Sequence, residues 1–166
     1  RLAELKTSPL GELVAAADPN EPLRARAQAE YGCPRVFAGY EELLAEVELD
    51  AVYIFADNAT TADLAIAAAG RGLPIMVEKP IAADLLGADR MVAAACNAGV
   101  PLMVNWPFYW TPQLQHALAM AQRGEIGRLL EVRHRGGHRG PKEVGCSPCF
   151  RDWLHDRRLN GGGALI

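Results

Sequence analysis

The chain has 166 residues, of which 50% are apolar and 22% are charged, and its formal net charge is −3 at pH 7. This length is sufficient for a domain with a sizeable core, and the composition is that of a folded globular protein. No apolar run approaches the roughly 18 residues of a transmembrane helix, and the acidic balance gives no basic footprint for nucleic acid. We therefore expect neither a membrane nor a nucleic acid as a partner.

Short apolar runs alternate with alanine-rich segments from Leu13 to Val104, which predicts an α/β fold with a doubly wound parallel sheet. The runs are continuously apolar rather than alternating, as in strands that are buried on both faces. The predicted strands span residues 13–17, 35–37, 51–55, 75–77 and 102–104, and the predicted helices span residues 21–31, 40–46, 61–71 and 85–98.

The last of these helices has a clear start and one apolar face. Asp84 is its predicted N-cap, and helical spacing predicts a buried stripe formed by Leu85, Ala88, Val92 and Ala95. Cys96 beside this stripe is expected to be a small buried hydrophobe. The four cysteines are too scattered for a disulfide scaffold, so we expect a reducing, cytoplasmic location. An export signal on a longer precursor remains an alternative.

The pattern changes after Val104. An aromatic loop at residues 106–110 is followed by a predicted helix at 113–123 and a predicted strand at 129–134. The tract at residues 135–160 is irregular and rich in glycine, proline and charge. We interpret residues 1–105 as one domain built on a parallel sheet and residues 106–166 as the start of a second, α+β domain.

The sequence Glu78-Lys79-Pro80 directly follows the predicted strand at residues 75–77. The carboxyl ends of parallel strands face the ligand crevice of such folds, and a proline ends the strand immediately afterwards. We therefore expect the ammonium of Lys79 to point into a binding cleft. The alternative is a solvated lysine at a strand end.

Glu78-Lys79-Pro80 resembles the signature of the Gfo/Idh/MocA oxidoreductases, a nicotinamide-dependent family that includes glucose-fructose oxidoreductase and inositol dehydrogenase. Four further stretches match this family in order, at residues 13–18, 50–54, 124–128 and 161–166. The resemblance implies that residues 1–105 are a partial dinucleotide-binding domain with a Rossmann-type fold and that residues 106–166 begin a substrate-binding α+β domain. It further implies the transfer of a hydride between NAD and a secondary alcohol or ketone of a sugar or cyclitol. It also implies a homo-oligomer for the full-length protein.

A Rossmann domain opens with a strand and a G-x-G-x-x-G turn, and an acidic residue follows about 20 residues later. Asp18 fits that acidic residue, so the first strand and the glycine turn are expected to be missing from this sequence. In the strand order 3-2-1-4-5-6 the missing strand is the central one, and its absence leaves two unpaired inner edges. We interpret the chain as an internal part of a dehydrogenase, inactive and poorly folded by itself.

Asp18 is the predicted ligand of the adenosine ribose hydroxyls. Its carboxylate favours NAD over NADP because it repels a 2′-phosphate, although Arg24 or Arg26 could bind that phosphate, which leaves NADP possible. The alternative is a turn aspartate before Pro19.

Ala56 and Asn58 are further predicted cofactor contacts, because they follow the strand that neighbours the missing one. Family members typically have Thr-Pro-Asn here and a histidine three residues after the asparagine, whereas this chain has Asp57 and Thr61 at two of those positions. Asn58 could still hydrogen-bond the cofactor, or the segment could simply cap a helix; the sequence leaves both open.

Lys79 is the predicted catalytic residue. Its ammonium can hydrogen-bond the reacting hydroxyl, stabilise alkoxide character and relay a proton. Glu78 is expected to orient the cofactor rather than to titrate, and both residues are expected to contact the cofactor.

The predicted substrate contacts are Trp106, Tyr109, His138 and Trp153. Family members often carry arginines where Phe108 and Tyr109 stand, so an aromatic wall suited to sugar rings replaces cationic contacts here, and phosphorylated substrates are disfavoured. Each of these residues alone is more often structural. The departures at Thr61, Phe108 and Tyr109 favour a second hypothesis, a non-catalytic protein of the same fold that binds the cofactor or a sugar.

A zinc site formed by His134, His138, Cys146 and Cys149 is a minor alternative. Residues i and i+4 of a strand are about 13 Å apart, and the order of ligands is unlike common zinc modules. We therefore expect no metal.

Overall fold

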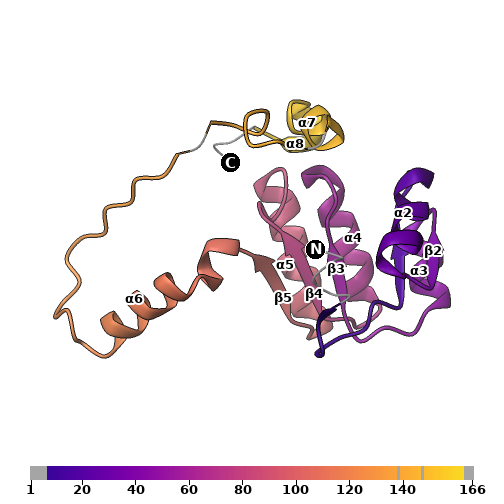
Figure 1. The fold of residues 1–166 in the computed structure, drawn as a ribbon. Helices are drawn as coiled ribbons and strands as arrows, with labels where there is room; N and C mark the ends of the chain where they lie inside the picture. Colours follow the sequence, from indigo (N-terminus) through magenta and orange to yellow (C-terminus); the bar gives the residue numbers. More distant parts are fainter. Residues whose placement is uncertain (1–6, 138, 147, 163–166) are drawn as a thin grey trace.

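The computed structural model describes residues 7–162 apart from positions 138 and 147. In this part of the chain the strands form two parallel sheets (Figure 1). One pairs β1 (Ala15–Ala17) with β2 (Arg35–Phe37). The other has the order β3-β4-β5, formed by β3 (Val52–Ile54), β4 (Ile75–Glu78) and β5 (Leu102–Asn105). All five strands lie within the predicted strands or extend them by one residue, which confirms the α/β fold.

Helices connect the parallel strands, as a doubly wound fold requires. They are α2 (Glu21–Tyr31), α3 (Tyr40–Glu46), α4 (Asn58–Gly70) and α5 (Leu85–Ala98). Three of them have the predicted bounds, and α4 begins three residues early. The reason is Asp57, which caps this helix by accepting a hydrogen bond of 3.0 Å from the backbone N–H of Thr60. Asp84 caps α5 in the same way, as predicted, by accepting one of 2.7 Å from Gly87.

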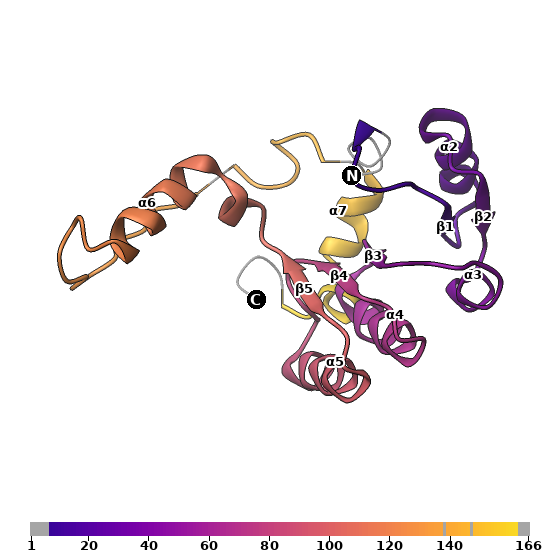
Figure 2. The ribbon, with the colours of Figure 1, turned by 90° about the horizontal axis from the view of Figure 1, so that it is seen from below.

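The two sheets are not hydrogen-bonded to each other. In a Rossmann sheet of order 3-2-1-4-5-6, β1 and β3 would flank the same central strand, and among the described residues no strand lies between them. An apolar cluster joins the two groups instead. Phe37, Leu43 and Leu44 form its buried centre, and Val52 of β3 and Ala67 of α4 pack against it. Figure 2 shows β1, β2, α2 and α3 as one group beside the larger sheet.

The main core lies between the three-stranded sheet and the helices α4 and α5, which run side by side on one of its faces (Figure 2). Alanines on α4 allow the two helices to approach closely, and Ala65 and Ala68 are completely buried. Ile75 and Val77 of β4 and Met91 of α5 fill the space beneath them. Burial of a side chain as large as Met91 stabilises the fold by about 1.5–3 kcal/mol.

The predicted stripe on α5 is wrong in two of its four residues. Leu85 is 83% exposed and Val92 is 46% exposed, whereas Met91 and Ala95 are the buried residues of this helix. The face that meets α4 carries the small Gly87, where a Cβ would touch Ala62 of α4 at an ordinary contact distance of 3.5 Å and crowd Ala82 at 3.3 Å. Close helix contact therefore selects a different face from the one with the most apolar residues. Cys96, predicted to be buried, is exposed for the same reason.

Beyond β5 the chain has fewer contacts with the sheet. A short 3-10 helix, η1 (Pro107–Trp110), leads into α6 (Pro112–Gln122), which confirms the predicted helix there. Figure 1 shows α6 and the segment after it pointing away from the sheet before the chain returns in α7 (Pro148–Leu154) and α8 (Arg157–Asn160). The predicted second domain and its boundary near residue 105 stay predictions.

The strand predicted at residues 129–134 is not formed. Leu129, Leu130 and Val132 are 60%, 79% and 74% exposed. A strand needs a neighbouring strand to satisfy its backbone groups, and the described residues place none beside this segment. In the described part of the chain, none of the helices is both long and apolar enough to cross a membrane.

Candidate functional site

The carboxyl end of β4 carries Glu78, and the register of the sheet places Asn105 of β5 directly beside it. The Nδ2 of Asn105 donates a hydrogen bond of 2.8 Å to Oε1 of Glu78. The other carboxylate oxygen, Oε2, accepts a hydrogen bond of 3.2 Å from the backbone N–H of Lys79. Asn105 is 9% exposed. The carboxylate of Glu78 is therefore held in one orientation by a buried amide.

Sequence reasoning missed Asn105, although a signal was present. It is the last residue of a strand that runs parallel to β4, and β4 ends at Glu78. Carboxyl ends of neighbouring parallel strands lie at the same edge, so the pairing of β4 with β5 was sufficient to bring these two polar side chains together.

Lys79 follows Glu78 at this edge, and its side chain is exposed. Among the described residues, none forms a hydrogen bond or an ion pair with its ammonium. The group is accessible to a ligand at the end of β4, next to a carboxylate whose orientation is fixed. The predicted roles of Lys79 and Glu78 remain predictions.

Asp18 follows β1, as predicted, and its Oδ1 accepts a hydrogen bond of 2.8 Å from the backbone N–H of Asn20. This is the contact of a turn aspartate. A cation lies beside it, because the guanidinium of Arg24 donates a hydrogen bond of 2.6 Å to the carbonyl oxygen of Asp18. Arg26 is directed elsewhere and pairs with Glu30 at 2.8 Å. Of the two candidate arginines, Arg24 is thus the one next to the predicted ribose site.

Asn58 opens α4 and is only 4% exposed. Its Nδ2 donates two hydrogen bonds to Asn160, of 3.0 Å to the backbone carbonyl and 2.8 Å to the side-chain oxygen. Both amide hydrogens are therefore used within the chain. The predicted contact of Asn58 with a cofactor stays a prediction that only its oxygen could fulfil. Ala56, its predicted companion, is half-buried against the main core.

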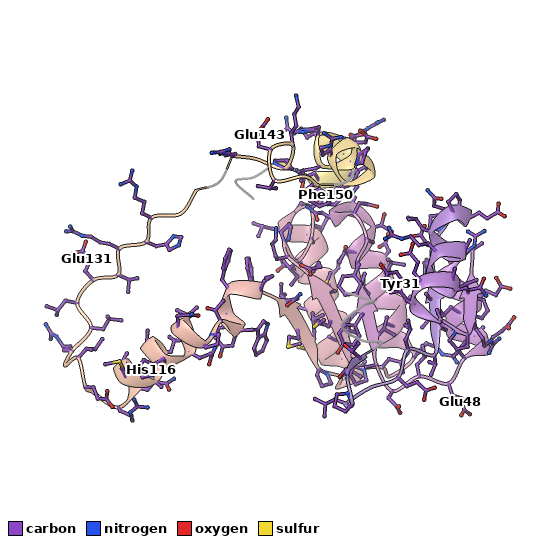
Figure 3. The ribbon with its side chains drawn as sticks, viewed as in Figure 1. Tyr31, Glu48, His116, Glu131, Glu143 and Phe150 are labelled. Atoms are coloured by element: carbon purple, nitrogen blue, oxygen red, sulfur yellow. The ribbon has the colours of Figure 1, made fainter. Side chains whose placement is uncertain are left out.

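The predicted substrate residues lie on two separate elements. Trp106 and Tyr109 are 55% and 47% exposed around η1, where Tyr109 contacts Trp110 edge to face at 4.9 Å between ring centroids. Trp153 lies on α7 and packs at 5.1 Å against Phe150, which Figure 3 labels. It also lines a shallow pocket of about 490 Å³ with Asp152, Asp156 and Leu159. His138 lies outside the described residues.

Charged residues surround α7 and α8. Lys142, Arg151, Asp152 and His155 line a second shallow pocket of about 430 Å³. Asp156 caps α8, and hydrogen bonds from the side chain and the backbone of Arg158 lower the pKa of its carboxyl to about 2. In the described ranges no three His, Cys, Asp or Glu side chains are grouped to hold a metal ion. Of the four residues in the zinc alternative, His138 and the side chain of Cys149 lie outside what the structure describes.

Similarity to known proteins points to one family. Residues 1–106 match the family model GFO/IDH/MocA, described as an oxidoreductase family with an NAD-binding Rossmann fold. A D-apiose dehydrogenase of Paraburkholderia graminis is 40% identical over 121 residues, which are 70% of this chain and 31% of that protein. A D-xylose 1-dehydrogenase (NADP(+)) 2 of Haloferax volcanii is 34% identical over 121 residues, 73% of this chain and 37% of that protein. The chain thus spans about a third of the length of these relatives.

Among solved structures, an oxidoreductase of Agrobacterium radiobacter in complex with NAD+, L-tartaric acid and magnesium is similar, with a TM-score of 0.72 and 27% identity. The similarity covers 76% of this chain and 37% of that chain. The sequence match covers more than half of the chain, and the fold agrees with the parallel α/β arrangement described above. The chain therefore belongs to the Gfo/Idh/MocA family of oxidoreductases, whose NAD-binding domain has a Rossmann fold.

Proposed function

We propose that the protein containing this chain is a nicotinamide-dependent dehydrogenase that acts on a secondary alcohol or ketone of a sugar or cyclitol. The observation that carries the proposal is the accessible Lys79 beside the fixed carboxylate of Glu78, at the ligand-facing end of β4. Relatives named as D-apiose and D-xylose dehydrogenases support a sugar as the substrate class.

Asp18 and Arg24 suit the ribose end of the cofactor. In the turn after β1, no described residue donates a hydrogen bond to Oδ2 of Asp18, so this oxygen can accept one from a ribose hydroxyl. Arg24 beside it offers a cation for the 2′-phosphate of NADP. We propose NAD as the preferred cofactor, with NADP as the second candidate. When bound, the nicotinamide supplies the hydride acceptor or donor.

Lys79 supplies the proton chemistry. Its ammonium donates a hydrogen bond to the substrate oxygen and stabilises the negative charge that develops there as the carbon loses hydride. In the oxidation direction the nitrogen releases one of its own protons to solvent, to which the side chain is exposed, and takes up the hydroxyl proton in its place; in the reduction direction the ammonium gives a proton to the new alkoxide. Glu78 is held by Asn105, and its carboxylate fixes the backbone of Lys79 by accepting a hydrogen bond from the N–H of Lys79. Exposed aromatic rings at Trp106 and Tyr109 offer flat apolar surfaces for a sugar ring.

The test is a screen of the whole protein, expressed from its complete reading frame, against sugars and polyols with NAD and with NADP. Appearance of reduced nicotinamide identifies the substrate and the cofactor. Replacing Lys79 with methionine should lower kcat by at least ~100-fold because a general acid-base group is lost, while cofactor affinity stays close to that of the wild type. Lys142→Met, at an exposed lysine of another segment, is the matched control. Near-normal turnover of the Lys79 variant would remove this lysine from the mechanism.

The second candidate is a non-catalytic protein that binds the cofactor or a sugar. The departures at Thr61, Phe108 and Tyr109 favour it, since Thr61 donates its hydroxyl to the carbonyl of Asp57 at 2.8 Å and serves the helix end. Cofactor binding by calorimetry without turnover of any sugar or polyol would favour this candidate. Homo-oligomerisation of the whole protein and its cytoplasmic location remain predictions.

A further inference from the structure

We propose that Asn58 and Asn160 form a latch that holds the helix pair α7–α8 on the nucleotide-binding part of the chain. Resting on the proposed function, the latch positions the segment at residues 148–162 beside the loop that begins at Lys79. Asn58 and Asn160 are therefore positioning residues, and the latch goes beyond the binding roles expected of Asn58 alone.

The contacts of the latch are buried and continuous. Asn160 is 3% exposed and receives both hydrogens of the Asn58 amide. The amide of Asn160 in turn donates a hydrogen bond of 3.0 Å to the carbonyl of Leu154, the last residue of α7. A chain of hydrogen bonds therefore runs from the start of α4 through α8 to the end of α7. The two asparagines are 102 positions apart in the sequence.

The backbone on both sides of the latch is closely packed. Gly161 directly follows Asn160 with a φ of 89°, and a Cβ there would overlap the carbonyl oxygen of Ala83. The N–H of Ala83 donates a hydrogen bond of 3.1 Å to the carbonyl of Asn58. Asn58, Gly161 and Ala83 thus meet at one point, four residues beyond Lys79 along the loop. Figure 1 shows α8 lying against the N-terminal end of α4, which begins at Asn58.

The chemistry of the pair explains why it is a specific latch. A buried amide is costly unless its hydrogens find acceptors, and Asn160 provides one backbone and one side-chain acceptor for the two hydrogens of Asn58. Movement of α8 would take both acceptors away from the amide of Asn58, which is 4% exposed when α8 is in place. Docking of α8 in one register is therefore favoured over loose apolar contact, and the aromatic residues Phe150 and Trp153 of α7 are carried into a defined place.

The latch and a cofactor contact at Asn58 predict different patterns in variants. We consider Asn58→Ala, Asn160→Ala and the double variant in the whole protein, with Asn97→Ala as the matched control because Asn97 is an exposed asparagine of α5. Trypsin cleavage after Arg157 and Arg158 reports undocking of α8, since a protease needs this helix to open. Cofactor affinity and the kinetic constants for the substrate are measured on the same variants.

If the latch holds, both single variants and the double variant should be cleaved faster, by ~10-fold, because all three lose the 2.8 Å hydrogen bond between the two buried side chains. The kcat/KM for the substrate should fall by a similar factor, while the cofactor Kd changes less than twofold. The control should match the wild type. Because proteolysis does not depend on turnover, faster cleavage without activity on any sugar would uphold the docking role and count against the proposed function only.

Three results would overturn the proposal. A weaker cofactor Kd for Asn58→Ala, with Asn160→Ala like the wild type, would make Asn58 a cofactor contact. Faster cleavage with unchanged substrate constants would make the pair merely structural. If Asn58→Ala fails to fold, the proposal is tested with Asn160→Ala and Gly161→Ala. The added Cβ of Gly161→Ala would clash with the backbone of Ala83 and so displace α8. Unchanged cleavage of both variants would exclude the latch.

Discussion

The two parts of this chain are held together in different ways. Between β1 and β5, parallel strands, alanine-rich helices and a continuous apolar core fix each element by many contacts. After Asn105, α6 and the segment behind it make few contacts with the sheet, and α8 contacts helix α4, where Asn160 accepts hydrogen bonds from Asn58. Local sequence patterns are therefore sufficient to describe the first part, whereas the second depends on contacts between distant residues.

Removing a core side chain of the first part should have the largest effect on stability. Met91 is 1% exposed between α5 and the sheet, so Met91→Ala should lower the free energy of unfolding by about 2–5 kcal/mol through lost burial and a cavity. Urea unfolding of the whole protein measures this loss. Val92→Ala, at the next residue but 46% exposed, should change it by no more than about 0.5 kcal/mol. Equal losses in the two variants would show that the buried face of α5 is not the one described.

The same helix shows what the sequence could not predict. Its bounds at residues 85–98 and its cap at Asp84 follow from local signals and are confirmed. Its buried face depends on its neighbours, because Met91 and not Val92 belongs to the core that α5 shares with α4 and β4. Apolar spacing therefore predicts that a helix is amphipathic, but the neighbouring helix decides which residues it buries.

The candidate site shows the same division. The positions of Asp18, Glu78 and Lys79 at strand ends were predictable because each follows a short apolar run directly. Their partners were predicted less completely, since Arg24 was only one of two candidate arginines and Asn105 was missed although it ends the strand beside β4. Asn58 is the extreme case, because its partner lies in a tract that carries no period and contains the two unpredicted helices α7 and α8.

Asn105 is the last residue of β5 and lies where the two parts of the chain meet, so substitutions there test whether its amide holds Glu78. Asn105→Asp would place a second carboxylate against Oε1 of Glu78, and like charges at this distance raise the pKa of one of them. Below the raised pKa the two carboxyl groups share a proton, and a hydrogen bond between them forms again. The loss of kcat/KM caused by Asn105→Asp should therefore grow as the pH rises through the raised pKa. We expect a loss of kcat/KM of ~10-fold at neutral pH, the value of about one charged hydrogen bond.

The pH profile of kcat/KM measures this effect in the whole protein. Asn105→Ala is the control, because it removes the donor without adding a charge and should lower kcat/KM by a factor that does not vary with pH. Asn97→Asp adds the same charge on the exposed side of α5 and should behave as the wild type. An Asn105→Asp profile parallel to that of the wild type would mean that Glu78 is not held by this amide.

The smallest expected effect concerns the second part of the chain, where the cap that Asp156 forms on α8 depends on pH. Arg158 holds the pKa of this carboxyl at about 2, below its ordinary value of 3.8. Since the folded-state pKa is depressed, the cap is fully favourable above pH 3.8 and is lost as pH falls through about 2. The carboxyl resonance of Asp156 followed by NMR should titrate near 2, and Arg158→Gln should move it toward 3.8.

A carboxyl that titrates at its ordinary value before any substitution would mean that α8 is not capped as described. The latch would then lose its support, because the N–H of Asn160 donates a hydrogen bond of 2.9 Å to the carbonyl of Asp156. The cap and the latch lie at the two ends of a helix of four residues, which is too short to persist by itself. The fixed position of α8 therefore depends on both contacts together, in contrast to the core helices, where no single polar contact decides the position.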